Sequence, residues 1–150
     1  METNIKILVV DDDWTNRKLM SACLKKVSNC DEADDGMLGI QKFQSALEAG
    51  EKYDLLFLDI IMPGINGIEV VKLIREIEGK FNIPGSDGVK IILCTSLDKT
   101  NSIADSLNSG YEGYLVKPIS KGALFDEMEK FGFRCQSDKT KSGTMSSLNI

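Results

Sequence analysis

Several short polar motifs in the chain have residue types that together can do chemistry. They are, in chain order, Asp11-Asp12-Asp13, Asp59, Thr95-Ser96 and Lys117. Carboxylates that converge repel one another and raise each other's pKa unless a cation is present. Oxygen ligands without histidine or cysteine select a hard ion, which here predicts Mg²⁺, with Mn²⁺ as a substitute. A hydroxyl and an ammonium beside that ion suit a phosphoryl group held on an oxygen nucleophile.

Each motif ends or directly follows a short apolar run, and these runs predict strands. They cover residues 5–10, 54–58, 89–94 and 113–116, with residues 30–33 as a weaker candidate. Between the runs, apolar residues recur at helical spacing, namely Leu19, Cys23 and Val27; Ile40, Phe43 and Leu47; Ile68, Val71 and Ile74; Ile103 and Leu107; and Leu124, Met128 and Phe131. The alternation predicts an α/β fold, a doubly wound parallel sheet with helices on both faces. Ligands bind at the carboxyl ends of such strands, where the polar motifs lie.

Glycines and polar stretches predict where the elements end. Gly50 and Gly110 are expected to stop helices. Residues 78–88 predict a loop, and residues 134–150 predict a flexible polar tail that follows one domain at residues 1–133.

Composition narrows the classes of function. The net charge of −5 argues against direct binding of nucleic acid. The chain contains no histidine, which excludes Ser/His/Asp and Cys/His catalysis and histidine-ligated metals. No apolar stretch approaches the roughly 20 residues that span a bilayer. We therefore expect a cytoplasmic protein without membrane insertion, whose four cysteines are reduced.

Each polar motif also has a purely structural explanation. Asp13 or Thr15 is expected to cap the helix that follows the first strand. Taken singly, Thr95 is explained as a turn residue and Lys117 as a surface lysine. Their joint placement at strand ends favours the interpretation as a site.

The motifs resemble those of the receiver domain of two-component response regulators. The resemblance rests on VVDD at 9–12, DIIMPGING at 59–67, TS at 95–96 and YLVKPIS at 114–120, and it covers about residues 5–131. It implies a flavodoxin-like (βα)5 fold of five parallel strands in the order 2-1-3-4-5.

By this resemblance, Asp59 is the phosphoacceptor. Asp11, Asp12 and Asp59 bind Mg²⁺, together with the main-chain carbonyl of Ile61. Asn66 stands where the family often has aspartate, at a position outside the active centre.

The same resemblance assigns the remaining motifs. Thr95 and Lys117 contact the phosphoryl oxygens, and Tyr114 acts with Thr95 as a conformational switch. The Lys117-Pro118 peptide bond is expected to be cis, as it is in the family.

Two further expectations concern the surface around the site. Trp14, at the rim of the site, and the first predicted helix are candidate contacts for the phosphodonor. The resemblance to receiver domains also implies that Ile61 and Leu97 flank the approach of water to phosphorus, and because both are apolar, we expect slow hydrolysis of the aspartyl phosphate.

Three other classes of site fit parts of the sequence less well. A phosphatase of the haloacid dehalogenase type would use Asp11 as nucleophile and Asp13 as general acid. That fold needs a further strand with acidic metal ligands after Lys117, whereas only one helix and a polar tail are expected there. A flavodoxin would have to bind phosphate at a loop of three aspartates, which would repel it. A calcium loop at Asp35-Gly36 lacks ligands at Ala33 and Lys42.

The sequence therefore predicts a stand-alone receiver, a phosphorylation switch rather than a metabolic enzyme. A histidine kinase or a histidine phosphotransfer protein would supply the phosphoryl group. Output would follow through contact with an unidentified protein or through onward phosphorelay. A fragment of a hybrid kinase is a third possibility, against which Met1 argues mildly.

Overall fold

A five-stranded parallel sheet forms the centre of the molecule, in the order β2-β1-β3-β4-β5. The structure is a computed structural model that describes residues 5–96 and 110–133. Its strands are β1 (Lys6–Val10), β2 (Asn29–Ala33), β3 (Leu55–Asp59), β4 (Lys90–Ser96) and β5 (Gly113–Lys117). The helices of these residues are α1 (Trp14–Leu24), α2 (Gly36–Glu48), α3 (Gly67–Lys80) and α5 (Lys121–Lys130), with a 3-10 helix, η1 (Gly85–Asp87). The predicted doubly wound fold and strand order are confirmed.

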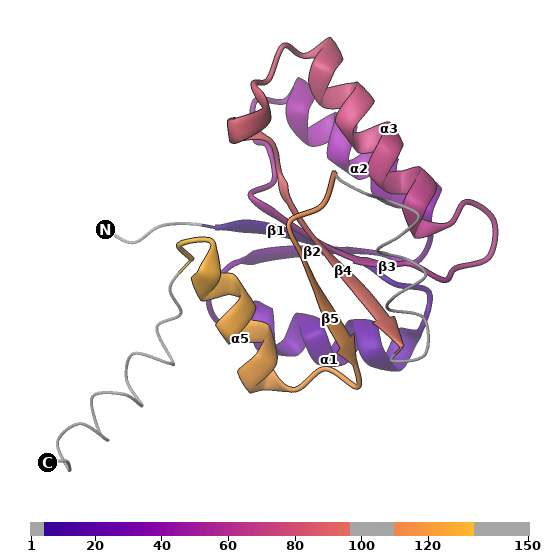
Figure 1. The fold of residues 1–150 in the computed structure, drawn as a ribbon, viewed down its shortest axis with the longest axis vertical. Coiled ribbons are helices and arrows are strands. Elements are labelled where there is room, and N and C mark those ends of the chain that lie inside the picture. The colour runs from indigo at the N-terminus through magenta and orange to yellow at the C-terminus, as the bar shows by residue number, and fades with distance from the viewer. Residues whose placement is uncertain (1–4, 97–109, 134–150) are drawn as a thin grey trace, which may run out of the picture.

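Helices cover both faces of the sheet, with α2 and α3 on one side and α1 and α5 on the other (Figure 1). Two hydrophobic clusters result, one under each pair of helices. In β3, Leu56 and Leu58 belong to the first cluster, while Leu55 and Phe57 belong to the second. A central strand therefore buries every residue, which is why it reads as a continuous apolar run rather than an alternating one.

The register of the sheet brings the polar motifs to one edge. Val10 of β1 pairs with Leu58 of β3, so that Asp11 follows beside Asp59. Asp59 itself pairs with Cys94 of β4, directly before Thr95. On the next strand, Ser96 pairs with Lys117. Parallel strands end at the same edge, and this edge therefore collects the carboxylates, the hydroxyls and the lysine.

Capping side chains fix where the helices near this edge begin. Asp13 is the N-cap of α1 and accepts a hydrogen bond from the Thr15 backbone N–H at 3.1 Å, so that Asp13, of the two candidates, is the cap. Asn66 caps α3, and its side chain forms a capping box with Glu69. Gly50, with a φ of 75°, lies just after α2, where a helix stop was predicted.

The buried face of α1 differs from the predicted one. The spacing of Leu19, Cys23 and Val27 predicted the core face, but Leu19 is 64% exposed and Val27 lies beyond the end of the helix. Met20 and Leu24 face the core instead, beside the buried polar residues Arg17 and Ser21. The apolar pattern was misleading because half of the buried face is polar.

The predicted loop at residues 78–88 begins later than expected. Helix α3 continues to Lys80, and Glu78 is buried within it. The Glu78 carboxylate accepts hydrogen bonds at 2.7 Å from Arg75 and from the Val89 backbone N–H. These bonds hold the last turn of α3 against the start of β4.

Some predictions concern residues outside the described ranges. The predicted helix around Ile103 and Leu107, the position of Leu97 and the tail at residues 134–150 all lie there.

No helix in residues 5–96 and 110–133 has the length and apolar character that crossing a membrane requires.

Candidate functional site

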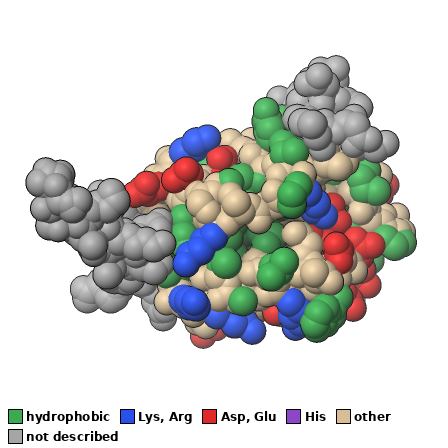
Figure 2. Space-filling view, turned by 90° about the horizontal axis from the view of Figure 1, so that it is seen from below, with side chains coloured by type: hydrophobic (Ala, Val, Ile, Leu, Met, Phe, Trp, Pro, Cys, Tyr) green, Lys and Arg blue, Asp and Glu red, His purple; other side chains and the backbone are tan. Residues whose placement is uncertain are grey.

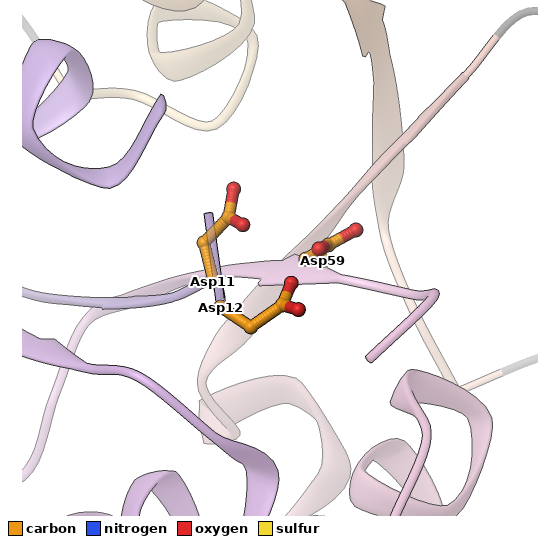
Figure 3. Close-up of side chains that lie close together, drawn as sticks. All are labelled: Asp11, Asp12 and Asp59. Carbon is orange, nitrogen blue, oxygen red and sulfur yellow. The ribbon is translucent and has the colours of Figure 1, made fainter. Parts of the chain in front are cut away.

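Three carboxylates meet at the carboxyl ends of β1 and β3 (Figure 3). Asp11, Asp12 and Asp59 each place one oxygen so that all three lie within 4.8 Å of one another. Asp11 and Asp59 are buried, and Asp12 is exposed at the mouth of the site. The predicted acidic residues are therefore brought together.

Lys117 joins the two buried carboxylates from the end of β5. Its Nζ lies 3.3 Å from Asp59 Oδ1 and 3.4 Å from Asp11 Oδ2. One cation thus faces two carboxylates, and the four predicted side chains carry a net negative charge. A divalent cation would balance that charge.

Hydrogen bonds orient Asp11 but leave Asp12 free to point into the site. Asp11 Oδ2 accepts a bond of 2.5 Å from Asn16 Nδ2, and Asp11 Oδ1 accepts one of 2.9 Å from the Asp13 backbone N–H. Within the described part of the chain, no hydrogen bond or ion pair holds the Asp12 carboxylate. Its position follows from the backbone of the loop between β1 and α1.

Burial and like charge make Asp59 hard to ionise. Burial, followed by the negative charge of Asp11, raises its pKa from 3.8 to about 7, although Lys117 opposes the rise. Burial alone would lower the pKa of Lys117, but the charges of Asp59 and Asp11 outweigh it and raise that pKa. Lys117 is therefore cationic at neutral pH, whereas Asp59 needs a further cation to be fully ionised.

The donor set fits Mg²⁺. Asp11, Asp12 and Asp59 offer only carboxylate oxygens, which Mg²⁺ and Mn²⁺ bind and which softer metals do not prefer. Burial, followed by the charge of Asp11, raises the pKa of Asp59, and a bound divalent cation would lower that pKa by favouring the ionised carboxylate.

The other predicted residues lie around this centre. Thr95 is buried at the end of β4, where its Oγ1 donates a hydrogen bond of 3.3 Å to the Ser96 carbonyl. Tyr114 lies on β5 and is 48% exposed. Ile61 is also exposed, two residues after Asp59. The Lys117-Pro118 bond is cis, as predicted.

Two residues that orient the site were missed from the sequence. Asn16 holds the Asp11 carboxylate, and the Arg17 guanidinium donates a hydrogen bond to the Asp11 carbonyl. Both lie in the first turns of α1. The sequence signal for this contact is Arg17 itself, a polar residue on the same side of α1 as Met20 and Leu24. It was missed because the apolar spacing predicted a different buried face.

An apolar rim, made of the exposed side chains of Trp14 and Leu19, lies on α1, the helix that follows Asp11 and Asp12 in the chain. Trp14 is 63% exposed, and Leu19 lies on the same helix, with a groove of about 180 Å³ between α1 and the start of α5. Figure 2 shows hydrophobic side chains interspersed with lysine and arginine on the side of the molecule that α1 and α5 form. Exposed aromatic and aliphatic side chains next to a reactive centre are typical of a docking surface.

Comparison with known proteins agrees with this geometry. The family model of the response regulator receiver domain matches residues 7–129. The osmosensing histidine protein kinase SLN1 of Saccharomyces cerevisiae is 31% identical over 92% of this chain, which spans only 11% of that kinase. The chemotaxis protein CheY-3 of Vibrio cholerae is 31% identical over 87% of this chain and 93% of its own length.

A solved structure shows the same fold in a complex. It is the co-crystal structure of the Saccharomyces cerevisiae histidine phosphotransfer signaling protein Ypd1 and the receiver domain of its downstream response regulator Ssk1. The matched chain aligns with a TM-score of 0.73 and 27% identity, over 88% of this chain and 91% of that one.

The chain belongs to the family of response regulator receiver domains of two-component signalling. Receiver domains are signalling switches rather than classical enzymes.

Proposed function

We propose that this chain accepts a phosphoryl group from a phosphohistidine donor onto Asp59, in a Mg²⁺-dependent reaction that switches a protein-binding surface. The observation that carries the proposal is the convergence of Asp11, Asp12, Asp59 and Lys117 at one edge of the sheet. Such a centre suits phosphoryl transfer because catalysis of that reaction is mainly positioning and neutralisation of charge.

The positions of these groups support a transfer step by direct displacement. A carboxylate oxygen of Asp59 forms a bond to phosphorus while the bond between phosphorus and the donor's imidazole nitrogen breaks, and the imidazole leaves. Asp59 ends a fully buried strand, so the rigid sheet fixes the nucleophile. Lys117, 3.3 Å from Asp59, supplies positive charge beside the incoming phosphoryl oxygens.

Asp11, Asp12 and Asp59 would hold Mg²⁺, with the Ile61 carbonyl as a further proposed ligand. The bound ion would supply positive charge to the phosphoryl oxygens. Thr95 is proposed to donate its hydroxyl to those oxygens after transfer. Its present hydrogen bond to the Ser96 carbonyl, at 3.3 Å, is long and easily exchanged.

Tyr114 is proposed to carry the signal outward. It is half-exposed on the edge strand β5, on which Lys117 also lies. A movement of Thr95 toward a phosphoryl group would open space along β4 and β5, and inward packing of Tyr114 would then change the surface beside α5. This local change of contacts would alter which proteins the surface binds.

The donor is proposed to be a histidine kinase or a histidine phosphotransfer protein, docked on α1 beside Trp14 and Leu19. Three findings support this: the exposed apolar rim, the likeness to the receiver in the Ypd1 complex, and the relatedness to SLN1. Output through protein contact or onward relay, action as a stand-alone receiver, and a cytoplasmic location belong to the same proposal.

A transfer assay tests the proposal. A phosphorylated histidine phosphotransfer protein, mixed with this chain and MgCl₂, should lose its phosphoryl group to the chain. Chelation with EDTA and the variant Asp59→Asn should each abolish the transfer. Transfer that is equally fast with EDTA, or that survives in Asp59→Asn, would contradict the proposal.

A further inference from the structure

We propose that Arg17 is a positioning residue for the metal ligand Asp12, acting through the peptide group that joins Asp11 to Asp12. This inference rests on the proposed Mg²⁺-dependent function and adds to it a residue that touches neither the metal nor the phosphoryl group.

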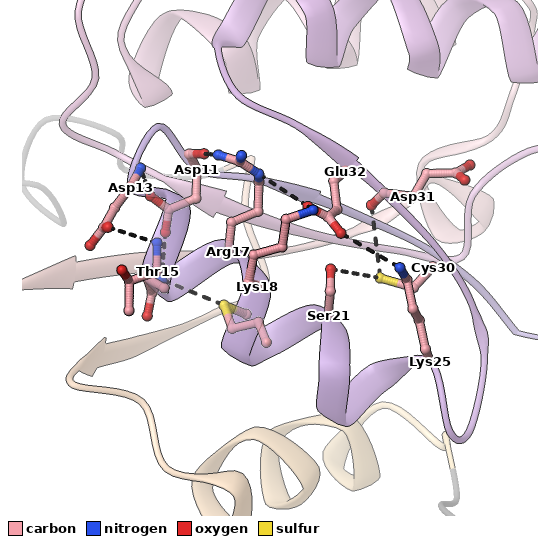
Figure 4. Close-up of polar contacts among 12 residues, drawn as sticks. Asp11, Asp13, Thr15, Arg17, Lys18, Ser21, Lys25, Cys30, Asp31 and Glu32 are labelled. Atoms are coloured by element: carbon pink, nitrogen blue, oxygen red, sulfur yellow. Dashed lines mark hydrogen bonds and ion pairs between the residues drawn. The ribbon is translucent and has the colours of Figure 1, made fainter.

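Arg17 reaches the loop of the site from the core-facing side of α1 (Figure 4). Its Nη1 donates a buried hydrogen bond of 2.7 Å to the Asp11 carbonyl oxygen. Its Nε donates one of 3.1 Å to Glu32 Oε1 on β2. The side chain is only 11% exposed, so that the guanidinium is held on both sides and has little room to move.

Glu32 is what keeps Arg17 in place. A buried guanidinium is costly unless it is paired and hydrogen-bonded. Burial raises the pKa of Glu32, but hydrogen bonds from Ser21, Lys18 and Arg17 outweigh this effect and lower that pKa. Glu32 therefore stays ionised, and it also faces Lys18 Nζ at 3.0 Å and Lys25 Nζ at 3.7 Å. The pair fixes the guanidinium relative to the sheet.

The hydrogen bond to the Asp11 carbonyl connects the fixed Arg17 side chain to the proposed metal site. It belongs to the peptide group that leads into Asp12, whose carboxylate has no partner among the described residues. The loop is anchored on both sides of Asp12, because Asp11 N–H donates to Ala33 O at 3.1 Å and Arg17 N–H donates to Asp13 O at 2.9 Å. The hydrogen bond from the Arg17 side chain sets the orientation of the peptide between these anchors, and with it the direction of the Asp12 side chain.

A purely electrostatic role and a positioning role of Arg17 predict opposite effects of its removal on Mg²⁺ affinity. If Arg17 acted only through its charge, Arg17→Met would make the site more negative and would tighten Mg²⁺ binding. If Arg17 positions Asp12, the same substitution frees the loop and weakens binding. Loss of groups that orient metal ligands typically costs 10–100-fold in affinity. Because one loop position is affected here, we expect the low end, about a tenfold loss.

Arg75 provides a matched control at the opposite edge of the sheet. Like Arg17, it lies on a helix and binds a backbone carbonyl, Gly110 O at 2.9 Å, and a glutamate, Glu78 Oε1 at 2.7 Å. It is more exposed than Arg17, and it also pairs with Glu112 at 3.1 Å. Arg75→Met should lower the free energy of unfolding by a similar amount, yet it should leave Mg²⁺ affinity unchanged. Arg17→Lys keeps the charge but cannot reach both partners, and it should weaken binding about threefold, since one of two hydrogen bonds is lost.

The experiment compares Mg²⁺ dissociation constants of the full chain and these variants through Trp14 fluorescence, with free Mn²⁺ counted by electron paramagnetic resonance as a second measure. Unfolding in urea gives the stability of each variant. Weaker binding by Arg17→Met and Arg17→Lys, with unchanged binding by Arg75→Met, supports the inference. Unchanged or tighter binding by Arg17→Met overturns it, and if that variant does not fold, Arg17→Lys decides by the same criterion. Failure of the unmodified chain to bind either ion would overturn the proposed function itself.

Discussion

Removal of the Asp59 charge should stabilise the metal-free protein, although it destroys the proposed nucleophile. Burial and the charge of Asp11 raise the pKa of Asp59 from 3.8 to about 7, so that the ionised form is disfavoured in the folded state. This difference corresponds to roughly 4 kcal/mol at 1.36 kcal/mol per pH unit. We expect Asp59→Asn to raise the free energy of unfolding at pH 8 by about 2 kcal/mol. This is half of the full difference, because the loop and water relax around the charge in the wild type.

The sign of the pH dependence follows from proton binding. Between pH 3.8 and about 7, the folded protein holds a proton on Asp59 that the unfolded chain has released. The stability contributed by that proton is lost as the pH rises through this window. Wild type and Asp59→Asn should therefore be nearly equal in stability near pH 4, diverge as the pH rises and differ most above pH 7.

Urea unfolding in EDTA, followed by circular dichroism at several pH values, measures this difference. Addition of MgCl₂ should close the gap, because the ion stabilises the ionised site of wild type but binds the variant weakly. Asp126→Asn, which removes an exposed carboxylate from α5, should show no comparable gap. If Asp59→Asn were less stable than wild type at pH 8, or if the gap did not change with pH, the described electrostatics of the site would be wrong.

Three other changes probe the metal, the lifetime and the docking surface. Asp12→Ala should abolish the response of Trp14 fluorescence to Mg²⁺ without unfolding the protein, since Asp12 is exposed; unchanged affinity would mean that the ligands are misassigned. The double variant Ile61→Asn with Leu97→Glu should lose its phosphoryl group severalfold faster than wild type after the donor is removed, because polar side chains can orient the attacking water. An equal or slower decay would contradict the proposed protection by these side chains. Leu19→Glu, on the exposed side of α1, should slow transfer from a histidine phosphotransfer protein at least fivefold while labelling by a small phosphodonor stays unchanged. Equal slowing with both donors would place Leu19 outside the docking surface.

The fold and the main carboxylates could be predicted because both depend on local patterns. Strand β3 is a continuous apolar run that ends in Asp59, and the parallel alternation of strands and helices brings such ends to one edge. Once the order of strands is known, the register places Asp11 beside Asp59 without further information. The chemistry of the site therefore follows from which residues end which strands.

The residues that orient this chemistry could not be predicted in the same way. Arg17 and Glu32 are separated by fifteen positions and meet only in the folded chain. Apolar spacing placed Leu19 in the core because Arg17 and Ser21 occupy part of the true buried face. Likewise, Glu78 looked like the start of a polar loop, although its buried contacts with Arg75 and Val89 extend α3. Polar residues that are buried through distant partners have no local signature.

Mapping of the phosphorylated residue tests the central claim most directly. The chain is incubated with a small phosphodonor and MgCl₂, the acyl phosphate is reduced with borohydride to homoserine, and the modified peptide is identified by mass spectrometry. One phosphoryl group per chain, carried by Asp59 and absent in Asp59→Ala, is the expected result. Modification of Asp11 instead, or full labelling of Asp59→Ala, would show that Asp59 is not the acceptor.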